Sequence, residues 1–167
     1  EFNKKIKILD IGSAVISEEP IYKQLLKKKI AHLNLFDGDI RQIDKIKKEY
    51  GNQNVSVFDK FIFDGKKRKV HMGTVLGGMT SLYEPNEKAL NFFNGFSHIG
   101  RIEKVKEIQT LKLDDIKDLD LIDFVKLDVQ GAELTILECG QEKLKNTLAL
   151  QLEVSFFNLY YNQPSFG

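Results

Sequence analysis

The sequence predicts an α/β fold in which a doubly wound, mostly parallel sheet is covered by helices, with residues 1–167 forming one domain. Short apolar runs alternate with stretches of roughly 10 to 15 residues whose apolar positions follow helical spacing. Most of the runs end in an acidic residue or a glycine. Alternation of this kind implies βαβ units with right-handed crossovers, and therefore parallel strands.

The first strand is predicted at residues 6–11, a short apolar run closed by Asp10 and Gly12. A polar stretch follows it. Apolar residues then recur at helical spacing, which predicts a helix over residues 21–30. Strand, loop and helix in this order form the first unit of the fold.

The second strand is predicted at 33–36, where an apolar run stops at an Asp-Gly-Asp turn, and a helix follows over 40–46. A third apolar run predicts a strand at 55–58. Residues 61–63 and 70–72 are then expected to pair as an extra hairpin, because the segment between them contains a glycine and is otherwise charged.

Residues 73–106 break the alternation with glycines, polar residues and scattered aromatics, which predicts an irregular insertion containing a helix over 86–93. Alternation returns with a strand at 121–127, a helix over 134–144 and a strand at 148–156. The last strand alternates strictly between apolar and polar residues, which fully buried parallel strands rarely do. It lies either at an exposed edge or with its polar side in a cleft, and we favour the cleft.

Composition restricts the classes of partner. The 25 basic and 24 acidic residues leave a formal net charge of +1, so no long-range field would attract nucleic acid or an anionic membrane. Cys139 is the only cysteine, which excludes an internal disulfide and fits a reducing compartment. The sequence contains neither a long apolar run nor a signal-peptide pattern. We expect a cytoplasmic protein without nucleic-acid or membrane partners, and its oligomeric state stays open.

Candidate site residues follow the strands, because open parallel sheets bind ligands outside the carboxyl ends of their strands. After the first strand, Gly12 lets a ligand approach the backbone, and the amides around Ser13 favour a negatively charged group. The dinucleotide fingerprint G-x-G-x-x-G is absent and Asp10 is too close for a phosphate cradle, which disfavours a pyrophosphate cofactor. Asp37 ends the second strand, where a carboxylate can accept hydrogen bonds from both hydroxyls of a ribose. An ordinary turn explains each segment alone about as well.

The segment 123–133 is the most informative part of the chain. Asp128 ends a buried strand, and a glycine turn and Glu133 follow, which brings two carboxylates to the mouth of the sheet. Glu133 is explained equally well by its favourable position at a helix N-terminus. Glu153 joins these acids if the polar side of the last strand faces the cleft.

Taken together, these segments resemble the FkbM family of S-adenosylmethionine-dependent methyltransferases. The resemblance rests on residues 9–12, 111–116, 122–133 and 151–154, on Tyr160 and Gln163–Pro164, and on Thr80–Ser81, which is similar to a loop serine of the family. It implies a seven-stranded, Rossmann-like class I fold and O-methylation of a hydroxyl on a sugar, glycan or secondary metabolite. It also implies that Asp10 and Gly12 line the methionine part of the cofactor, Asp37 the ribose, and Asp128 the region near the transferred methyl.

Two positions depart from the family pattern. Ile16 stands where members often carry a second glycine, which puts the shape of the first loop in question. The sequence also ends at Gly167, ahead of the sixth and seventh strands of the fold, so the expected sheet lacks its last two strands.

Methyl transfer to oxygen requires that the acceptor be aligned with the sulfonium and lose a proton. Alignment supplies about 7–11 kcal/mol of the barrier and a general base about 10²–10⁴-fold in rate, so alignment is the larger effect. The candidates for the base are Asp128, Glu153 and His98, although a lone histidine is more often a surface or packing residue. A divalent metal held by Asp128 with Glu133 or Glu153 is a less favoured alternative, because no clear ligand set is present.

Two other functions remain open. One is a nicotinamide or nucleotide-sugar enzyme, against which the missing glycine fingerprint argues. The other is a domain that binds S-adenosylmethionine without transferring the methyl group. Specificity for the small-molecule or glycan acceptor is expected in residues 73–106, since binding loops concentrate in long insertions near strand ends. The aromatic side chains Tyr83, Phe92, Phe93 and Phe96 could stack on a sugar there, but we favour a small satellite core.

Overall fold

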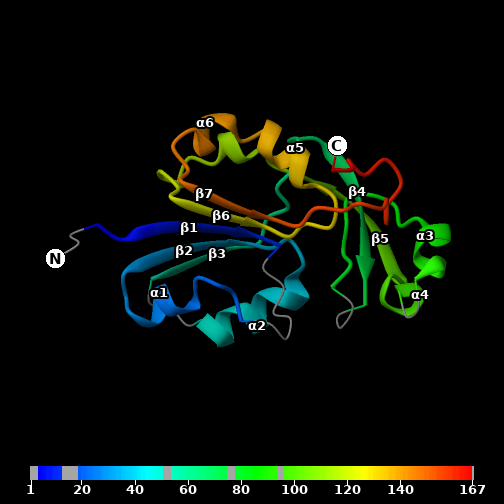
Figure 1. Cartoon of the computed structure of the whole chain (residues 1–167), viewed down its shortest axis with the longest axis horizontal. Coiled ribbons are helices and arrows are strands. Elements are labelled where there is room, and N and C mark those ends of the chain that lie inside the picture. Colours follow the sequence, from blue (N-terminus) through cyan, green and yellow to red (C-terminus); the bar gives the residue numbers. More distant parts are fainter. Residues whose placement is uncertain (1–3, 13–18, 51–53, 75–77, 94–95, 167) are drawn as a thin grey trace.

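The computed structural model describes residues 4–12, 19–50, 54–74, 78–93 and 96–166, which form a parallel sheet in the order β3-β2-β1-β6-β7 and a separate antiparallel pair, β4-β5 (Figure 1). The strands are β1 (Ile6–Ile11), β2 (Ala31–Phe36), β3 (Val55–Phe58), β4 (Lys67–Gly73), β5 (Ile102–Gln109), β6 (Phe124–Leu127) and β7 (Ala149–Leu152). The strand order reverses between β1 and β6, which is where ligands bind in folds of this class. The predicted α/β fold with a mostly parallel sheet is confirmed.

Helices cover both faces of the large sheet and lie beside the β4-β5 pair (Figure 1). They are α1 (Lys23–Lys27), α2 (Ile40–Tyr50), α3 (Glu87–Phe92), α4 (Phe96–Ile99), α5 (Glu133–Glu138) and α6 (Gln141–Leu144), with a 3₁₀ turn at Leu113–Asp115. In Figure 1, α1 and α2 cover one face, α5 and α6 cover the other, and α3 and α4 lie beside the β4-β5 pair. Among the residues described, no helix combines the length and the apolar character needed to cross a membrane.

Because both faces of the sheet are covered, successive residues of the central strands are buried. Successive residues of β1 point to opposite faces, and both Ile8 and Leu9 are fully buried. Ile8 packs with Tyr22 and the apolar residues of β2, whereas Leu9 packs with Val125 and Ile136. The first strand therefore has two separate cores, one on each side, and its carboxyl end is rigidly held.

The predicted hairpin of residues 61–63 and 70–72 is wrong. Ile62 forms an isolated parallel bridge with Leu111, and β4 instead pairs with β5. Burial explains the difference, because Ile62 and Phe63 are 3% and 5% exposed and belong to the main core beside α5. Two strongly apolar residues gain more from that core than from a hairpin exposed to solvent.

The second error concerns residues 73–106, which are not irregular throughout. They contain α3, as predicted, but also α4 and the first half of β5. Most residues of β5 are exposed, and its sequence IEKVKEIQ carries charges on both faces. Hydrophobic patterning could not reveal a strand that is held mainly by backbone pairing to β4.

The last strand is shorter than predicted and lies at an edge of the described sheet. Leu150 is 50% exposed, so the alternation in β7 reflects an open edge rather than a cleft. The favoured interpretation was therefore wrong for β7 itself. The cleft interpretation holds only for Glu153, which directly follows β7. Glu153 and Asp128 both accept a hydrogen bond from the Gln130 side-chain amide.

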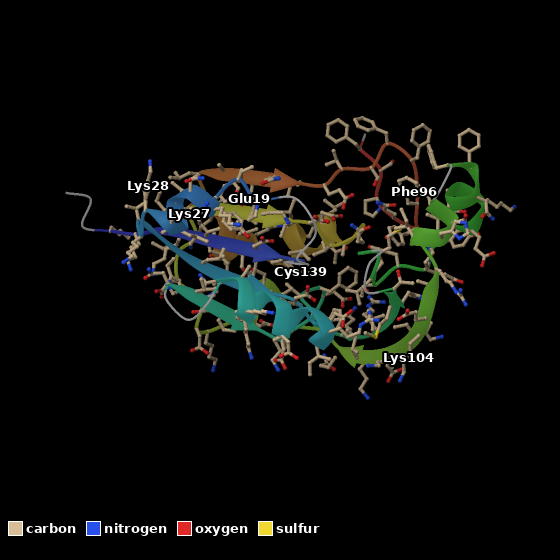
Figure 2. All side chains as sticks on the ribbon, turned by 90° about the horizontal axis from the view of Figure 1, so that it is seen from below. Glu19, Lys27, Lys28, Phe96, Lys104 and Cys139 are labelled. Carbon is tan, nitrogen blue, oxygen red and sulfur yellow. The ribbon has the colours of Figure 1, made fainter. Side chains whose placement is uncertain are left out.

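A small satellite core joins the β4-β5 side to the C-terminal segment. Met79, Leu90 and Tyr160 are buried together, with Tyr83 packed against them. Phe92 and Phe96 do not enter this core and are 81% and 37% exposed, and Figure 2 shows Phe96 at the end of the molecule far from Lys27 and Lys28. Tyr83 belongs to the satellite core, as predicted, whereas Phe92, Phe93 and Phe96 form a separate aromatic cluster with Phe157.

Candidate functional site

The carboxyl ends of β1, β2 and β6 meet at one edge of the sheet. Ile11 is in register with Phe36 of β2 on one side and with Leu127 of β6 on the other. The pairing continues past the strands, because the Gly12 amide donates to the Phe36 carbonyl at 2.9 Å and the Asp128 amide donates to the Ile11 carbonyl at 3.0 Å. Three predicted site residues, Gly12, Asp37 and Asp128, therefore follow three adjacent strand ends.

Gly12 is required at this edge for two reasons. Its φ is +82°, a left-handed conformation that residues with a side chain rarely adopt. A Cβ on Gly12 would lie 1.8 Å from the backbone oxygen of Asp128. Glycine thus allows the ends of β1 and β6 to close together. Ser13, predicted as the next cofactor-binding residue, and Ile16 lie outside the described residues.

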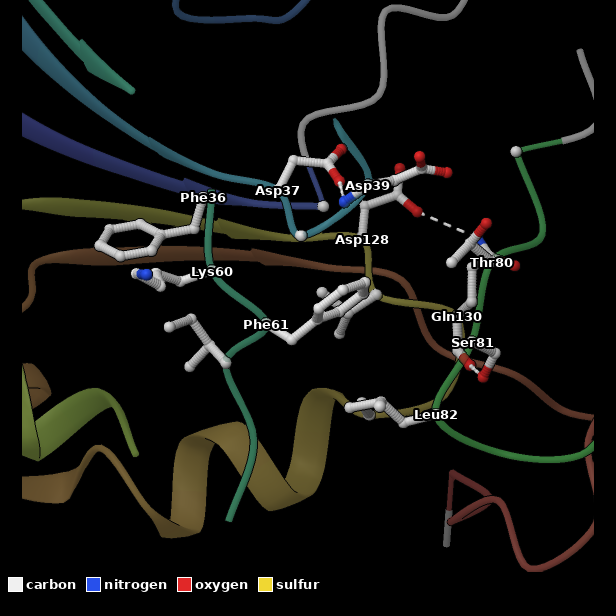
Figure 3. Close-up of a pocket in the computed structure, with 16 residues that line it drawn as sticks. Phe36, Asp37, Asp39, Lys60, Phe61, Thr80, Ser81, Leu82, Asp128 and Gln130 are labelled. Carbon is white, nitrogen blue, oxygen red and sulfur yellow. Dashed lines mark hydrogen bonds between the residues drawn. The ribbon is translucent and has the colours of Figure 1, made fainter. Parts of the chain in front are cut away.

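A cavity of about 630 Å³, counted with its open mouth, lies over these strand ends. Gly12, Asp37 and Asp128 all line it. In Figure 3, Phe36 and Lys60 lie at one end, Phe61 and the two acids in the middle, and Thr80, Ser81 and Gln130 at the other end.

Asp37 presents a carboxylate to the cavity from the end of β2. One of its oxygens accepts a hydrogen bond of 2.8 Å from the Asp39 amide. Burial, reinforced by the charges of Asp39 and Asp10, raises the pKa of Asp37 to about 6. A carboxylate so poorly hydrated gains from any donor that enters the cavity.

Asp39 has a structural role. It is 3% exposed, caps α2 by accepting the Arg41 amide at 3.0 Å, and pairs with the Arg41 guanidinium at 2.6 Å. These contacts are those of an N-cap residue at the start of the helix that follows β2.

Asp10 is 2% exposed and is not among the residues that line the cavity in the described part of the chain. The Tyr22 hydroxyl donates to one of its oxygens, and the Lys126 ammonium lies 3.4 Å from the other. Burial raises the pKa of Asp10, while Lys126 opposes the shift. The same ammonium is 3.5 Å from Asp128, so Asp10 anchors a lysine beneath the cavity.

Asp128 and Glu153 are connected by the side chain of Gln130. The Gln130 Nε2 donates to Asp128 Oδ1 at 3.1 Å and to Glu153 Oε2 at 2.9 Å. Desolvation and the neighbouring Asp128 charge raise the pKa of Glu153 to about 7. Asp128 lines the cavity and Glu153 lines a neighbouring hollow beside α5, so the acid pair spans the two, and one member exchanges a proton near neutral pH.

Glu133 serves the backbone rather than the cavity. Its Oε1 accepts the Val129 amide at 3.0 Å and the Gly131 amide at 3.4 Å, which closes the turn between β6 and α5. Burial raises the pKa of Glu133. Its position at the start of α5, one of the two interpretations of the sequence, is the one the geometry supports.

His98 is apart from this constellation. It lies on α4, its side chain is exposed, and it does not line the cavity. Within the described residues, no three His, Cys, Asp or Glu side chains are grouped so as to hold a metal ion.

Sequence reasoning missed two contributors, Gln130 and Lys126. Both lie in segment 123–133, but neither residue stands at a spacing that is typical of a catalytic or binding motif. Only the fold brings them against Asp10, Asp128 and Glu153.

Comparison with known protein families identifies the family of the chain. Residues 5–167 match the family described as the methyltransferase FkbM domain. Neither the curated proteins nor the solved structures contain a match to the chain.

Proposed function

Because the chain belongs to the FkbM methyltransferase domain family, we propose that it transfers a methyl group from S-adenosylmethionine to a hydroxyl oxygen of a sugar, glycan or secondary metabolite. The observation that carries the proposal is the gathering of Gly12, Asp37 and Asp128 around one cavity at the switch point of the sheet. S-adenosylmethionine supplies the methyl group, bound to a positively charged sulfur that a neutral nucleophile can displace.

The cavity residues suit the parts of this cofactor. Ionised Asp37 is able to accept both ribose hydroxyls, and each such bond contributes about 1.5–3 kcal/mol. Beside it, Phe36 and Phe61 provide apolar surface for an adenine ring. Gly12 keeps the backbone open for the methionine part, and the Asp128 carboxylate favours the positive sulfonium.

The acid pair then acts on the acceptor. As the acceptor oxygen forms its bond to the methyl carbon, the carbon–sulfur bond breaks and sulfur takes the electron pair, leaving S-adenosylhomocysteine. The hydroxyl proton passes to the Asp128–Glu153 pair. Because the pKa of Glu153 is about 7, a large fraction of the pair is ready to accept a proton at neutral pH.

The acceptor is proposed to approach from the side of Thr80 and Ser81. These residues form the cavity wall opposite Phe36 and belong to segment 73–106, where the sequence predicted acceptor specificity. The Thr80 hydroxyl on that wall fits an acceptor that itself carries several hydroxyls, whereas the Ser81 hydroxyl is bonded to the Gln130 carbonyl.

Titration calorimetry with S-adenosylhomocysteine tests the cofactor before any acceptor is known. We expect binding with a dissociation constant below about 100 μM, and none with NAD at the same concentration. Transfer of tritiated methyl from S-adenosylmethionine to a panel of monosaccharides, oligosaccharides and phenolic alcohols then tests the reaction. Absence of heat with S-adenosylhomocysteine would refute the proposed cofactor. Binding without transfer to any acceptor would indicate a non-catalytic binding domain.

A further inference from the structure

We propose that Gln130 is a positioning residue, which fixes the Asp128 and Glu153 carboxylates relative to each other, and that the Tyr160 hydroxyl anchors the opposite end of the Gln130 amide. The inference rests on the proposed function for the role of the acid pair. The arrangement of the four side chains stands on the structure alone.

The direction of the amide follows from its three hydrogen bonds. The Tyr160 hydroxyl donates to Gln130 Oε1 at 2.8 Å, while Nε2 donates to both carboxylates. Rotating the amide by half a turn would place Oε1 against two acids that offer it no proton when ionised. Because the ionised acids only accept, Nε2 faces them, and the Tyr160 hydroxyl donates to the Oε1 on the other side.

Both ends of this connection are anchored. Tyr160 is 1% exposed and packs with Met79 and Leu90, so its hydroxyl is aimed from a rigid core. The Gln130 backbone has a left-handed φ of +55°, and its carbonyl accepts the Ser81 hydroxyl at 2.7 Å (Figure 3). Gln130 is therefore held at its backbone by one segment and at its side chain by another.

The charges around Glu153 disfavour its ionised form, and the Gln130 amide counteracts this effect. Asp128, at the end of β6, and Glu133, on α5, both raise the pKa of Glu153, and only the Lys126 ammonium opposes them. The Tyr160 hydroxyl from the C-terminal segment faces the same acids, and burial together with their charges raises its pKa, which keeps it a neutral donor. Two N–H groups of an amide stabilise ionised carboxylates without adding a charge that would repel the sulfonium.

Carboxyl titration by NMR tests the inference without an acceptor. Glutamate labelled with carbon-13 at Cδ gives one signal per residue, and Glu153→Gln identifies that of Glu153 by its loss. Tyr160→Phe removes the hydroxyl at nearly constant volume. Gln130→Asn keeps the amide and suits a positive φ. Its side chain is about 1.5 Å shorter, so the amide cannot contact both acids at once. Tyr161→Phe is the matched control, since Tyr161 is 43% exposed and lines a separate cavity beside Phe63.

We expect the upper titration midpoint of the pair to rise by about half a pH unit or more in Tyr160→Phe and in Gln130→Asn, which is about a threefold change in proton affinity. Tyr161→Phe should titrate like the wild type. Unchanged Glu153 titration in both test variants would overturn the inference. Calorimetry with S-adenosylhomocysteine on the same samples keeps the two proposals separate. If the wild type does not bind it, the proposed function fails, while the titration still decides the role of Gln130.

Discussion

Replacing Asp37 by asparagine separates the stability of the fold from the binding of the cofactor. The pKa of Asp37 is about 6 instead of 3.8, a difference that corresponds to about 3 kcal/mol. Between these two values the folded protein binds a proton that the unfolded chain has lost, so the free energy of unfolding falls as the pH rises. Well above pH 6 the folded protein has also released this proton, so the free energy of unfolding no longer changes with the titration of Asp37.

Asp37→Asn should therefore be more stable than the wild type at pH 8, by up to about 3 kcal/mol, and of similar stability at pH 3. Asparagine has nearly the same volume, and its Oδ1 can still accept the Asp39 amide. Urea denaturation at the two pH values measures the difference. Asp44→Asn, an exposed change on α2, is the control and should leave stability unchanged within about 0.5 kcal/mol.

The same substitution should weaken S-adenosylhomocysteine binding at least about tenfold at pH 8, because neutral asparagine offers a weaker acceptor to the ribose. If only ionised Asp37 binds, roughly one tenth of the wild type is competent at pH 5, so its affinity should rise about tenfold between pH 5 and pH 8. The variant should lack this part of the pH dependence. Equal affinity and equal pH dependence in calorimetry would remove Asp37 from the site, and a less stable variant at pH 8 would refute the electrostatic reasoning.

Three further substitutions test other parts of the structure. Gly12→Ala should lower the free energy of unfolding by at least about 3 kcal/mol in urea, because its Cβ would overlap the Asp128 carbonyl; wild-type stability would contradict this contact. Asp128→Asn should bind S-adenosylhomocysteine within about threefold of the wild type but transfer tritiated methyl at least about 100-fold more slowly, and full activity would exclude its role in proton transfer. Ile136→Ala should cost about 2–5 kcal/mol in urea, since Ile136 is fully buried beside Leu9, and a loss below about 1 kcal/mol would mean that this core is looser than described.

The central sheet could be predicted because its strands are buried on both faces. Four of the six residues in Ile6–Ile11 are apolar, and a short apolar run of this kind is visible without knowing its partners. Prediction failed where pairing depends on distant residues. Nothing near residues 61–63 indicates that Ile62 will bridge Leu111, and the charged strand β5 has no apolar face that a periodicity could reveal.

The residues of the site also divide into those that the sequence predicts and those that depend on distant contacts. Gly12, Asp37 and Asp128 could be predicted because topology alone brings the ends of parallel strands to one edge. The position of Asp10 beneath the cavity could not, since it depends on Tyr22 and the lysine that pair with it. The contact of Gln130 with Tyr160 joins residues 30 positions apart, through a C-terminal segment that returns beside the acid pair.

The β4-β5 pair shows why the wall of the cavity at Ser81 is a fixed surface and not a loose loop. Ser81 exchanges two backbone hydrogen bonds with His71 of β4, at 2.8 and 3.0 Å, and its hydroxyl reaches the Gln130 carbonyl. The Arg41 guanidinium of α2 also donates to the carbonyl of Gly73 at the end of β4, at 3.0 Å. The second sheet is thus attached to the first through α2 and through the Gln130 turn. An acceptor recognised by this wall meets a preorganised surface, so less of its binding energy is spent on ordering the protein and more remains to align its hydroxyl for transfer.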